Sequence, residues 1–120
     1  MAVTNTTITS VGANLFSDTN NANVAVTIKG SSTTVTQWDI DNTANVAQSF
    51  CKIYNSAGAI TVGTTVPDEI IMVPASTRIQ LVIPTGKIYG TGCQIATTTT
   101  AILAGATSPG SAVLIKAVYT

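Results

Sequence analysis

The sequence predicts an all-β fold, an antiparallel β-sandwich of the jelly-roll type with about seven to eight strands. Apolar and polar residues alternate with a period of two, and turn-forming residues recur about every 8–12 residues. No segment keeps a helical period over several turns. Threonine, valine and isoleucine, whose branched side chains favour strands, are common throughout. With 120 residues, the chain has the size of one domain and can bury a core without disulfide bonds.

The N-terminal segment, residues 1–23, differs from the rest of the chain. It is rich in threonine and asparagine, and Leu15 and Phe16 are its only adjacent pair of large apolar residues. Two interpretations stay open. The segment is an arm that lies on another protein with Leu15 and Phe16 as anchors, or it is a first strand with an irregular lead-in. We therefore expect an N-terminal segment or arm over 1–23 and a β-sandwich domain over 24–120.

Strand patterns follow in order along the remaining chain. We expect strands near 24–29, 33–40, 47–54, 69–73, 77–83, 88–97 and 112–119. The main turn clusters are Asp41-Asn42-Thr43, Asn55-Ser56-Ala57-Gly58, Pro74-Ala75-Ser76, Pro84-Thr85-Gly86 and Ser108-Pro109-Gly110. The glycines of Gly90-Thr91-Gly92 fall inside an expected strand, where they would permit a bulge or a close approach of another segment.

Two of the expected strands are apolar on both faces. These are Ile70-Ile71-Met72-Val73 and Val113-Leu114-Ile115. A strand buried on both sides of a two-layer sandwich needs a second cover, which a loop, the N-terminal segment or a neighbouring subunit would supply. Because the chain carries so few charges, we favour a subunit, with Ile70 and Met72 among the interface residues.

The charge content excludes several classes of partner. Five basic and five acidic residues give no net charge, and charged residues make up 8% of the chain against about 25% in an ordinary soluble domain. A basic field for nucleic acid or for an anionic membrane is therefore not expected. No apolar run approaches the ~18 residues of a membrane helix, and the first residues do not resemble a signal peptide. We expect a protein made in the cytoplasm.

The residues needed for common kinds of catalysis are scarce. The chain has no histidine, the commonest general base, and no G-x-S-x-G motif. Asp39 and Asp41 lie at positions i and i+2 of an expected strand beside Trp38, which is a pattern of glycan contacts and of glycosidase carboxylates. The favoured interpretation of the two aspartates is nevertheless a solvated strand residue and a turn opener. We expect no catalytic residue.

No cofactor or metal site is expected either. Cys51 and Cys93 are far apart in sequence and form no CxxC motif, so we expect two buried thiols, although a disulfide bond stays open. The oxygens of Asp39 and Asp41 are not part of a calcium-binding loop of known spacing. Lys52 and Tyr54, which share one strand face, are the nearest approach to a nucleotide platform and are better explained as a rim contact.

From about residue 47 to the end, the sequence resembles a known group of proteins. The similarity lies in Phe50, Lys52-Ile53-Tyr54-Asn55, Thr61-Val62-Gly63-Thr64, Pro67, Ile71-Met72-Val73-Pro74-Ala75, Tyr89-Gly90-Thr91-Gly92, Ile95-Ala96-Thr97 and Val118-Tyr119. In these residues the chain is similar to small β-sandwich virion proteins of tailed bacteriophages, which occur as capsid decoration (cement) proteins or with fibres. The resemblance carries over no catalytic residue.

The resemblance implies a structural role in a virion. The expected function is that of a decoration protein, which binds the major capsid protein of the assembled shell and stabilises it by non-covalent contacts. Leu15, Phe16, Ile70 and Met72 are the candidate interface residues, and the expected self-association is a homotrimer. The alternative is a carbohydrate- or receptor-binding module of a tail or head fibre, with Trp38, Asp39 and Asp41 as the glycan contacts.

Overall fold

The computed structural model describes residues 13–120, which form eight β-strands in two four-stranded antiparallel sheets. The strands are β1 (Asn14–Asn21), β2 (Val26–Lys29), β3 (Thr33–Asp41), β4 (Ser49–Tyr54), β5 (Glu69–Val73), β6 (Arg78–Tyr89), β7 (Cys93–Thr98) and β8 (Val113–Tyr119). The described part of the chain contains no helix that is long and apolar enough to cross a membrane.

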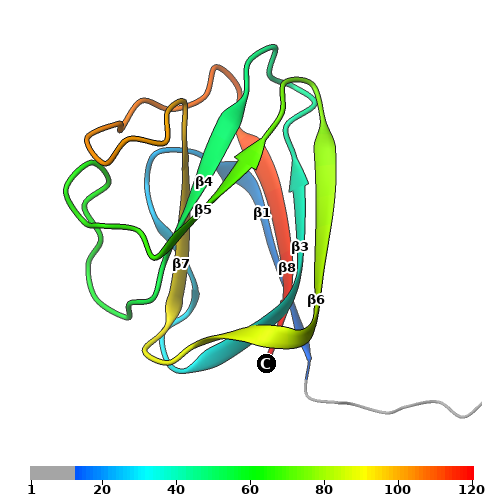
Figure 1. The fold of residues 1–120 in the computed structure, drawn as a ribbon, viewed down its shortest axis with the longest axis vertical. Helices are drawn as coiled ribbons and strands as arrows, with labels where there is room; N and C mark the ends of the chain where they lie inside the picture. The colour runs from blue at the N-terminus through cyan, green and yellow to red at the C-terminus, as the bar shows by residue number, and fades with distance from the viewer. Residues whose placement is uncertain (1–12) are drawn as a thin grey trace, which may run out of the picture.

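The strand order is that of a jelly roll. The first sheet has the order β1-β8-β3-β6 and the second sheet the order β2-β7-β4-β5. The antiparallel pairs β1–β8, β2–β7, β3–β6 and β4–β5 are those of one long hairpin folded over onto itself. Figure 1 shows the two sheets facing each other across the interior. The predicted all-β, jelly-roll-like sandwich is confirmed.

The core forms between the inward faces of the two sheets. Trp38 and Ile40 of β3 and Ile115 of β8 face Ile53 of β4 and Ile95 of β7, and all five are buried. Complete burial of an aliphatic side chain of this size stabilises a fold by about 1.5–3 kcal/mol. The alternation seen in the sequence therefore corresponds to a real inner face on these strands.

Two glycine-containing segments differ from their predictions. Pro84-Thr85-Gly86 is not a turn, because β6 continues through it as a bulge opposite Thr36, where the register of β6 with β3 shifts. Gly86 has φ of 77°, and a side chain there would meet the Thr34 methyl group. Gly90–Gly92 is not within a strand but separates β6 from β7. A Cβ on Gly92 would lie 2.9 Å from the Ser56 carbonyl oxygen, so the two segments cross closely there.

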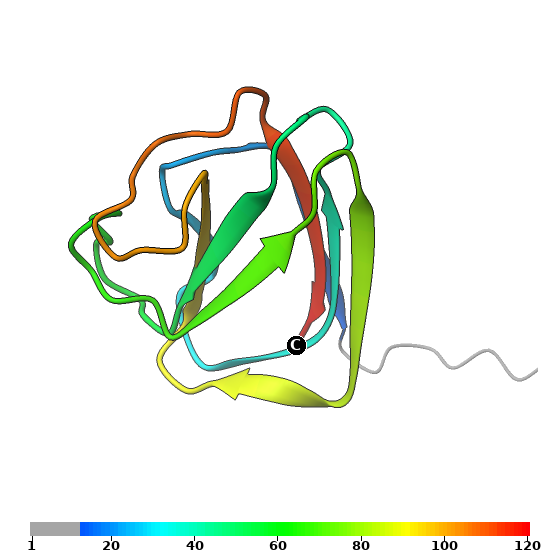
Figure 2. The ribbon, with the colours of Figure 1, turned by 45° about the horizontal axis from the view of Figure 1, so that its top comes forward.

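Beyond its bulge, β6 crosses one end of the sandwich. Figures 1 and 2 show this part of the strand, in yellow, running from the first sheet toward the second. At its end, the Tyr89 hydroxyl donates a hydrogen bond to the Glu69 carboxylate on β5. Burial, with the neighbouring Glu69 carboxylate, raises the pKa of Tyr89. This contact fixes β6 to the edge of the second sheet.

The N-terminal segment contributes a strand to the first sheet. Within residues 14–21, β1 pairs with β8 from Asn14 opposite Tyr119 to Asn21 opposite Val113. The first-strand interpretation thus describes this part, while Met1–Gly12 lie outside the described residues. Phe16 packs against the core and Leu15 points to the outside.

A buried asparagine organises the other end of the sandwich. The Asn42 amide donates hydrogen bonds to the carbonyl oxygens of Ala47 (3.1 Å) and Pro74 (3.0 Å). Its side-chain oxygen accepts from Asn45 Nδ2 and Ser49 Oγ at 2.9 and 2.8 Å. Both polar atoms of the Asn42 side chain therefore have partners, and the predicted Asp41-Asn42-Thr43 turn links the β3–β4 loop to the β5–β6 loop.

Candidate functional site

The chain's own loops cover the outer face of the second sheet over β4 and β7. Lys52 on β4 is buried, and its Nζ donates hydrogen bonds to the carbonyl oxygens of Ile102 (2.8 Å) and Gly105 (2.7 Å). Gln94 on β7 is also buried, and its Nε2 donates to the carbonyl oxygens of Ser56 and Gly58. The loop after β4 and the loop after β7 therefore close over these two strands, as Figure 1 shows on its left side.

This arrangement corrects the expectation about strands that are covered on both sides. Such strands do exist, but they are β4 and β7, and their second cover is a loop. On β5, Ile70 and Met72 point outward and are exposed. Leu114 on β8 is exposed as well. A subunit is therefore not needed to cover β4 and β7, and the outward residues of β5 and β8 remain open to solvent.

The outer face of the first sheet is not covered by any described loop. Leu15 of β1 and Val82 of β6 are 65% and 68% exposed there, at opposite edges of the sheet. Between these edges lie the charged side chains of Asp39 on β3 and Lys116 on β8, and Arg78 of β6 reaches toward Asp39. Figure 2 shows the loops gathered on the far side of the second sheet, away from this face. The described molecule thus has one sheet whose outer face is covered over β4 and β7 and one sheet whose outer face is left bare.

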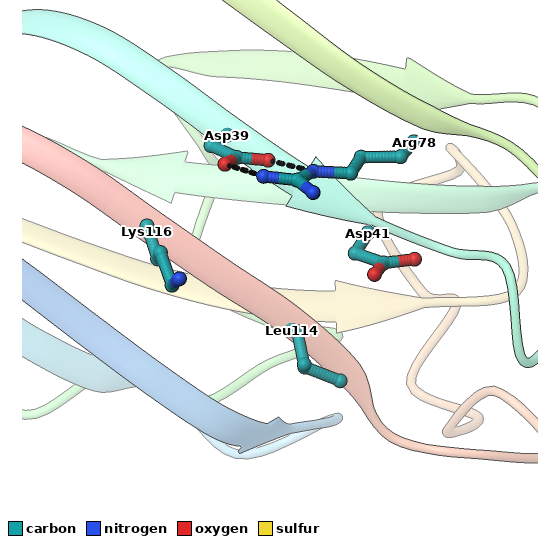
Figure 3. Close-up of a pocket in the computed structure, with 5 residues that line it drawn as sticks. All are labelled: Asp39, Asp41, Arg78, Leu114 and Lys116. Carbon is teal, nitrogen blue, oxygen red and sulfur yellow. Dashed lines mark hydrogen bonds and ion pairs between the residues drawn. The ribbon is translucent and has the colours of Figure 1, made fainter.

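Two adjoining hollows lie on the bare face. The first, of about 160 Å³, is lined by Asp39, Asp41, Arg78, Leu114 and Lys116 (Figure 3). The second, of about 70 Å³, is lined by Leu15, Gln37, Asp39, Lys116, Ala117 and Val118. Both are smaller than the ~300 Å³ at which pockets for small molecules begin. Because Asp39 and Lys116 line both hollows, they form one shallow depression that suits protruding side chains of another protein.

The charges in the depression are arranged to balance one another. Arg78 donates to both carboxylate oxygens of Asp39, from Nε at 2.8 Å and from a terminal nitrogen at 2.5 Å (Figure 3). This hydrogen bond holds the pKa of Asp39 below its ordinary value. The hydroxyl and amide of Thr43 donate to Asp41 and lower its pKa as well. Both carboxylates are ionised at neutral pH, so neither can act as the proton donor that glycoside hydrolysis requires.

The structure separates Trp38 from the two aspartates. Trp38 is 1% exposed and lies in the core, whereas Asp39 and Asp41 line the depression on the other face of β3. The indole ring therefore cannot stack on a sugar, and the expectation of Trp38 as a glycan contact is wrong. The physical reason is the strand itself, because neighbouring residues point to opposite faces.

The four candidate interface residues do not share one surface. Leu15 lies on the bare face, whereas Phe16 packs against the core and cannot anchor the chain to another protein in this conformation. Ile70 and Met72 are exposed on β5, in the other sheet. The structure thus places Leu15 beside Asp39 and leaves the β5 pair apart.

A larger cleft lies among the loops. It has a volume of about 450 Å³ and is lined by Asn23, Val24, Ala25, Ala59, Ile60, Thr61, Val62, Gln94 and Ala106. Its lining contains no charged and no aromatic side chain. Gln94, its buried amide, already donates to two loop carbonyl oxygens. Nothing in this lining points to a particular chemistry.

The two cysteines are structural. Cys51 and Cys93 are free and completely buried. Burial raises the pKa of the Cys51 thiol to about 11 and, together with the Glu69 charge, that of Cys93 to about 12. Thiols in this state are poor nucleophiles at neutral pH. Within residues 13–120, no three His, Cys, Asp or Glu side chains gather as a metal site would require.

Sequence reasoning missed the roles of Lys52, Gln94 and Lys116. Lys52 and Gln94 hold loops, and the only signal for this in the sequence is a long polar side chain within an otherwise apolar strand. Lys116 joins the depression because β8 lies beside β3, and this neighbourhood follows from strand order alone. Comparisons with known proteins supply no further guide, since no family model, no curated protein and no solved structure matches the chain.

Proposed function

We propose that the protein is a structural component of a tailed-phage virion, most concretely a decoration protein that binds the major capsid protein of the assembled shell. It acts by burying surface, without a catalytic group or cofactor. The outer face of the first sheet is the proposed contact, and we refer to it as the docking face. Leu15, Val82, Leu114 and the depression around Asp39 and Lys116 make up this face.

The observation that supports this proposal is the one-sided covering of the sandwich. Loops bury the outward side chains of β4 and β7, while β1 and β6 present large apolar side chains to solvent on the bare face. A stable protein interface takes about 800 Å² from each partner, and its energy comes from a few central anchors. The four-stranded sheet face offers exposed Leu114 on its inner strand β8, with Leu15 and Val82 at its two edges, as apolar anchors for such an interface. Jelly rolls also occur in viral capsid proteins, which supports the proposal by analogy of fold alone.

The second candidate, a receptor- or glycan-binding module, has less support. Jelly rolls occur among lectins too. The buried Trp38 removes the only aromatic ring that the sequence offered beside Asp39 and Asp41. The hydrogen bonds that Asp39 accepts from Arg78 also occupy one of the two carboxylates. The docking face is better suited to a protein surface than to a sugar.

The proposal is tested by adding the protein back to shells of the same phage that were assembled without it. We expect the wild-type protein to bind these shells and to raise the temperature at which they disrupt. Binding should persist in about 0.5 M salt, because an apolar contact leaves little Coulomb attraction to screen. A variant with Leu15→Asp and Leu114→Asp should show at least tenfold lower occupancy, since both changes put charge on the docking face.

A matched control carries the same change of charge elsewhere. Val24→Asp with Val66→Asp alters two exposed side chains in loops and should leave occupancy unchanged. Equal occupancy by both variants would show that the docking face is not the contact. Failure of the wild-type protein to bind any shell, together with binding of a glycan by the isolated protein, would favour the receptor-binding alternative.

A further inference from the structure

We propose that two copies of this chain pair antiparallel through residues Ile79–Ile83 of β6, which we call the β6 edge. The first sheets of the two copies would then join into one continuous eight-stranded sheet. The β6 edge adjoins the docking face and shares Val82 with it, but the inference rests on the pairing of strand edges and does not depend on the proposed virion function.

The β6 edge is the least protected of the described sheet edges. The other edge strands are β1, β2 and β5. β2 has four residues and ends in Lys29, β5 has five and begins with Glu69, and β1 carries Asp18 and a shift of register. Short length, charge and irregularity are the usual means by which proteins prevent edge pairing. In β6, by contrast, Ile79–Ile83 carries no charge, and Arg78 is held by Asp39.

Apolar surface is exposed along this edge. Leu81 lies opposite Trp38 on the inward side of β6, yet it is 40% exposed, because no described strand pairs beyond β6. Ile79 and Ile83, two residues away on either side, are only partly buried against the core. Val82 on the outward side is largely exposed. An added strand would cover all four residues.

The sequence of the edge is complementary to itself. In an antiparallel pair centred on Leu81, that residue lies opposite Leu81 of the second copy, and Ile79 lies opposite Ile83. All three inward positions are then matched by apolar side chains, so the two cores become continuous. On the outward side Gln80 lies opposite Val82. A pair centred on Gln80 would instead set Thr77 opposite Ile83.

The flanking residues limit the pair to this register. Pro84, which has no N–H group to donate to a partner strand, lies just beyond this five-residue run and opposite Arg78 of the other copy, where it ends the pairing. The Gly86 bulge ends the straight part of the strand. The two Arg78 side chains would be six residues apart along the joined strands, or about 20 Å. This exceeds the ~8 Å Debye length at physiological salt, so they would hardly repel each other.

The geometry favours two copies over the expected homotrimer. Antiparallel pairing of identical edges is isologous, and it closes after two copies. A three-fold ring would need two different complementary surfaces on each copy. The uncharged β6 edge matches itself and thereby supplies both sides of a two-fold contact.

Sedimentation of the full chain tests the proposal. We expect the mass of two copies at high concentration and dissociation on dilution. Leu81→Lys should give the mass of one copy at every concentration, because it places two ammonium groups at the centre of the pair. Ile88→Lys is the matched control, as Ile88 is on the same strand, 67% exposed and beyond the bulge. It should leave the two-copy mass unchanged.

A second measurement keeps the proposal falsifiable if Leu81→Lys fails to fold. Leu81→Cys should form a disulfide-linked pair under mild oxidation, since facing residues of antiparallel strands have Cα atoms within disulfide range. Ile88→Cys should not, and the native thiols are buried. A wild-type mass of one or three copies would overturn the proposal. So would a pair that is lost on deletion of residues 1–12, or equal cross-linking of both cysteine variants.

Discussion

Leu15 and Phe16 are adjacent in β1 but have different environments, and this difference can be measured. Phe16 packs against the core between the sheets, whereas Leu15 is mostly exposed on the docking face. Truncation of a core phenylalanine leaves a cavity, so Phe16→Ala should lower the free energy of unfolding by about 2–4 kcal/mol. Leu15→Ala should change it by less than about 0.5 kcal/mol. Urea unfolding of both variants checks the prediction, and equal losses would contradict the placement of β1.

The alternation of apolar and polar residues along β3 predicts some of the side-chain environments but not all of them. The period of two already implies that Trp38 and Asp39 face opposite sides of a strand. The alternation did not show whether Asp39 and Asp41 lie on an ordinary solvent-exposed face or in a binding site. In both cases the two aspartates alternate with the apolar residues Trp38 and Ile40. The structure answers this by burying Trp38 and Ile40 together. The bidentate partner of Asp39, Arg78, was beyond prediction, because it comes from a strand 39 positions further along the chain.

At the scale of the element, β6 depends on a conformation that glycine adopts readily. Gly86 has φ of 77°, and a Cβ there would clash with the Thr34 methyl carbon. Gly86→Ala should therefore destabilise the fold by about 1–3 kcal/mol, from backbone strain and from the shift of Thr34. Gly90→Ala is the matched control, because a Cβ on Gly90 meets no atom within 4 Å. Chemical denaturation of the two variants provides the comparison, and a cost at Gly90 as large as at Gly86 would contradict this account of the bulge.

The same strand shows why the boundaries of elements were the weakest part of the prediction. Pro84, Thr85 and Gly86 have the composition of a turn, yet on an edge strand proline and glycine are also the residues of a bulge. Which of the two forms depends on whether β3 continues beside them, and β3 does so from Thr33 to Asp41. Conversely, the separation of β6 from β7 at Gly90–Gly92 follows from a close crossing with Ser56, which is remote in sequence.

For the whole molecule, the sequence predicted the class of fold and most strands, but the covering of the sheets needed the structure. The first and last strands, β1 and β8, pair with each other, so the arrangement rests on contacts across the full length of the chain. The loops over β4 and β7 have little sequence pattern of their own. They are held in place by Lys52 and Gln94, whose polar groups have long enough stems to reach loop carbonyl oxygens. The docking face is the consequence, because no described loop lies over the outer face of the first sheet.

The stability of the whole molecule should be flat near neutral pH and fall in alkali. The chain has no histidine, so no side chain of ordinary pKa titrates between about pH 5 and 8. On the acid side, Asp39 and Asp41 have pKa values lowered below 3.8, so their stabilisation is present above that value and is lost only as the pH falls through the lowered pKa.

The alkaline fall is assigned to the buried thiols. The ordinary pKa of a cysteine is 9.0, and in the folded protein it rises to about 11 for Cys51 and about 12 for Cys93. Above pH 9 the unfolded chain therefore releases thiol protons that the folded chain keeps, and unfolding is favoured. At pH 10 each thiol should cost about 1.4 kcal/mol, or about 3 kcal/mol for both. Lys52 has the opposite effect on stability. Burial lowers its pKa, so the folded chain loses the Lys52 proton at a lower pH than the unfolded chain, and rising pH favours the folded state there.

A thiol-free variant separates these contributions. Cys51→Ala with Cys93→Ala will lose stability at every pH because two core side chains are truncated. What matters is the change between pH 7.5 and pH 10, measured by urea unfolding of each protein under reducing conditions. The wild-type protein should lose about 3 kcal/mol more over this interval than the variant does. If both proteins lose the same amount, the thiols are not buried as described, and the alkaline transition must come from the tyrosines, of which Tyr54 and Tyr89 have raised pKa values.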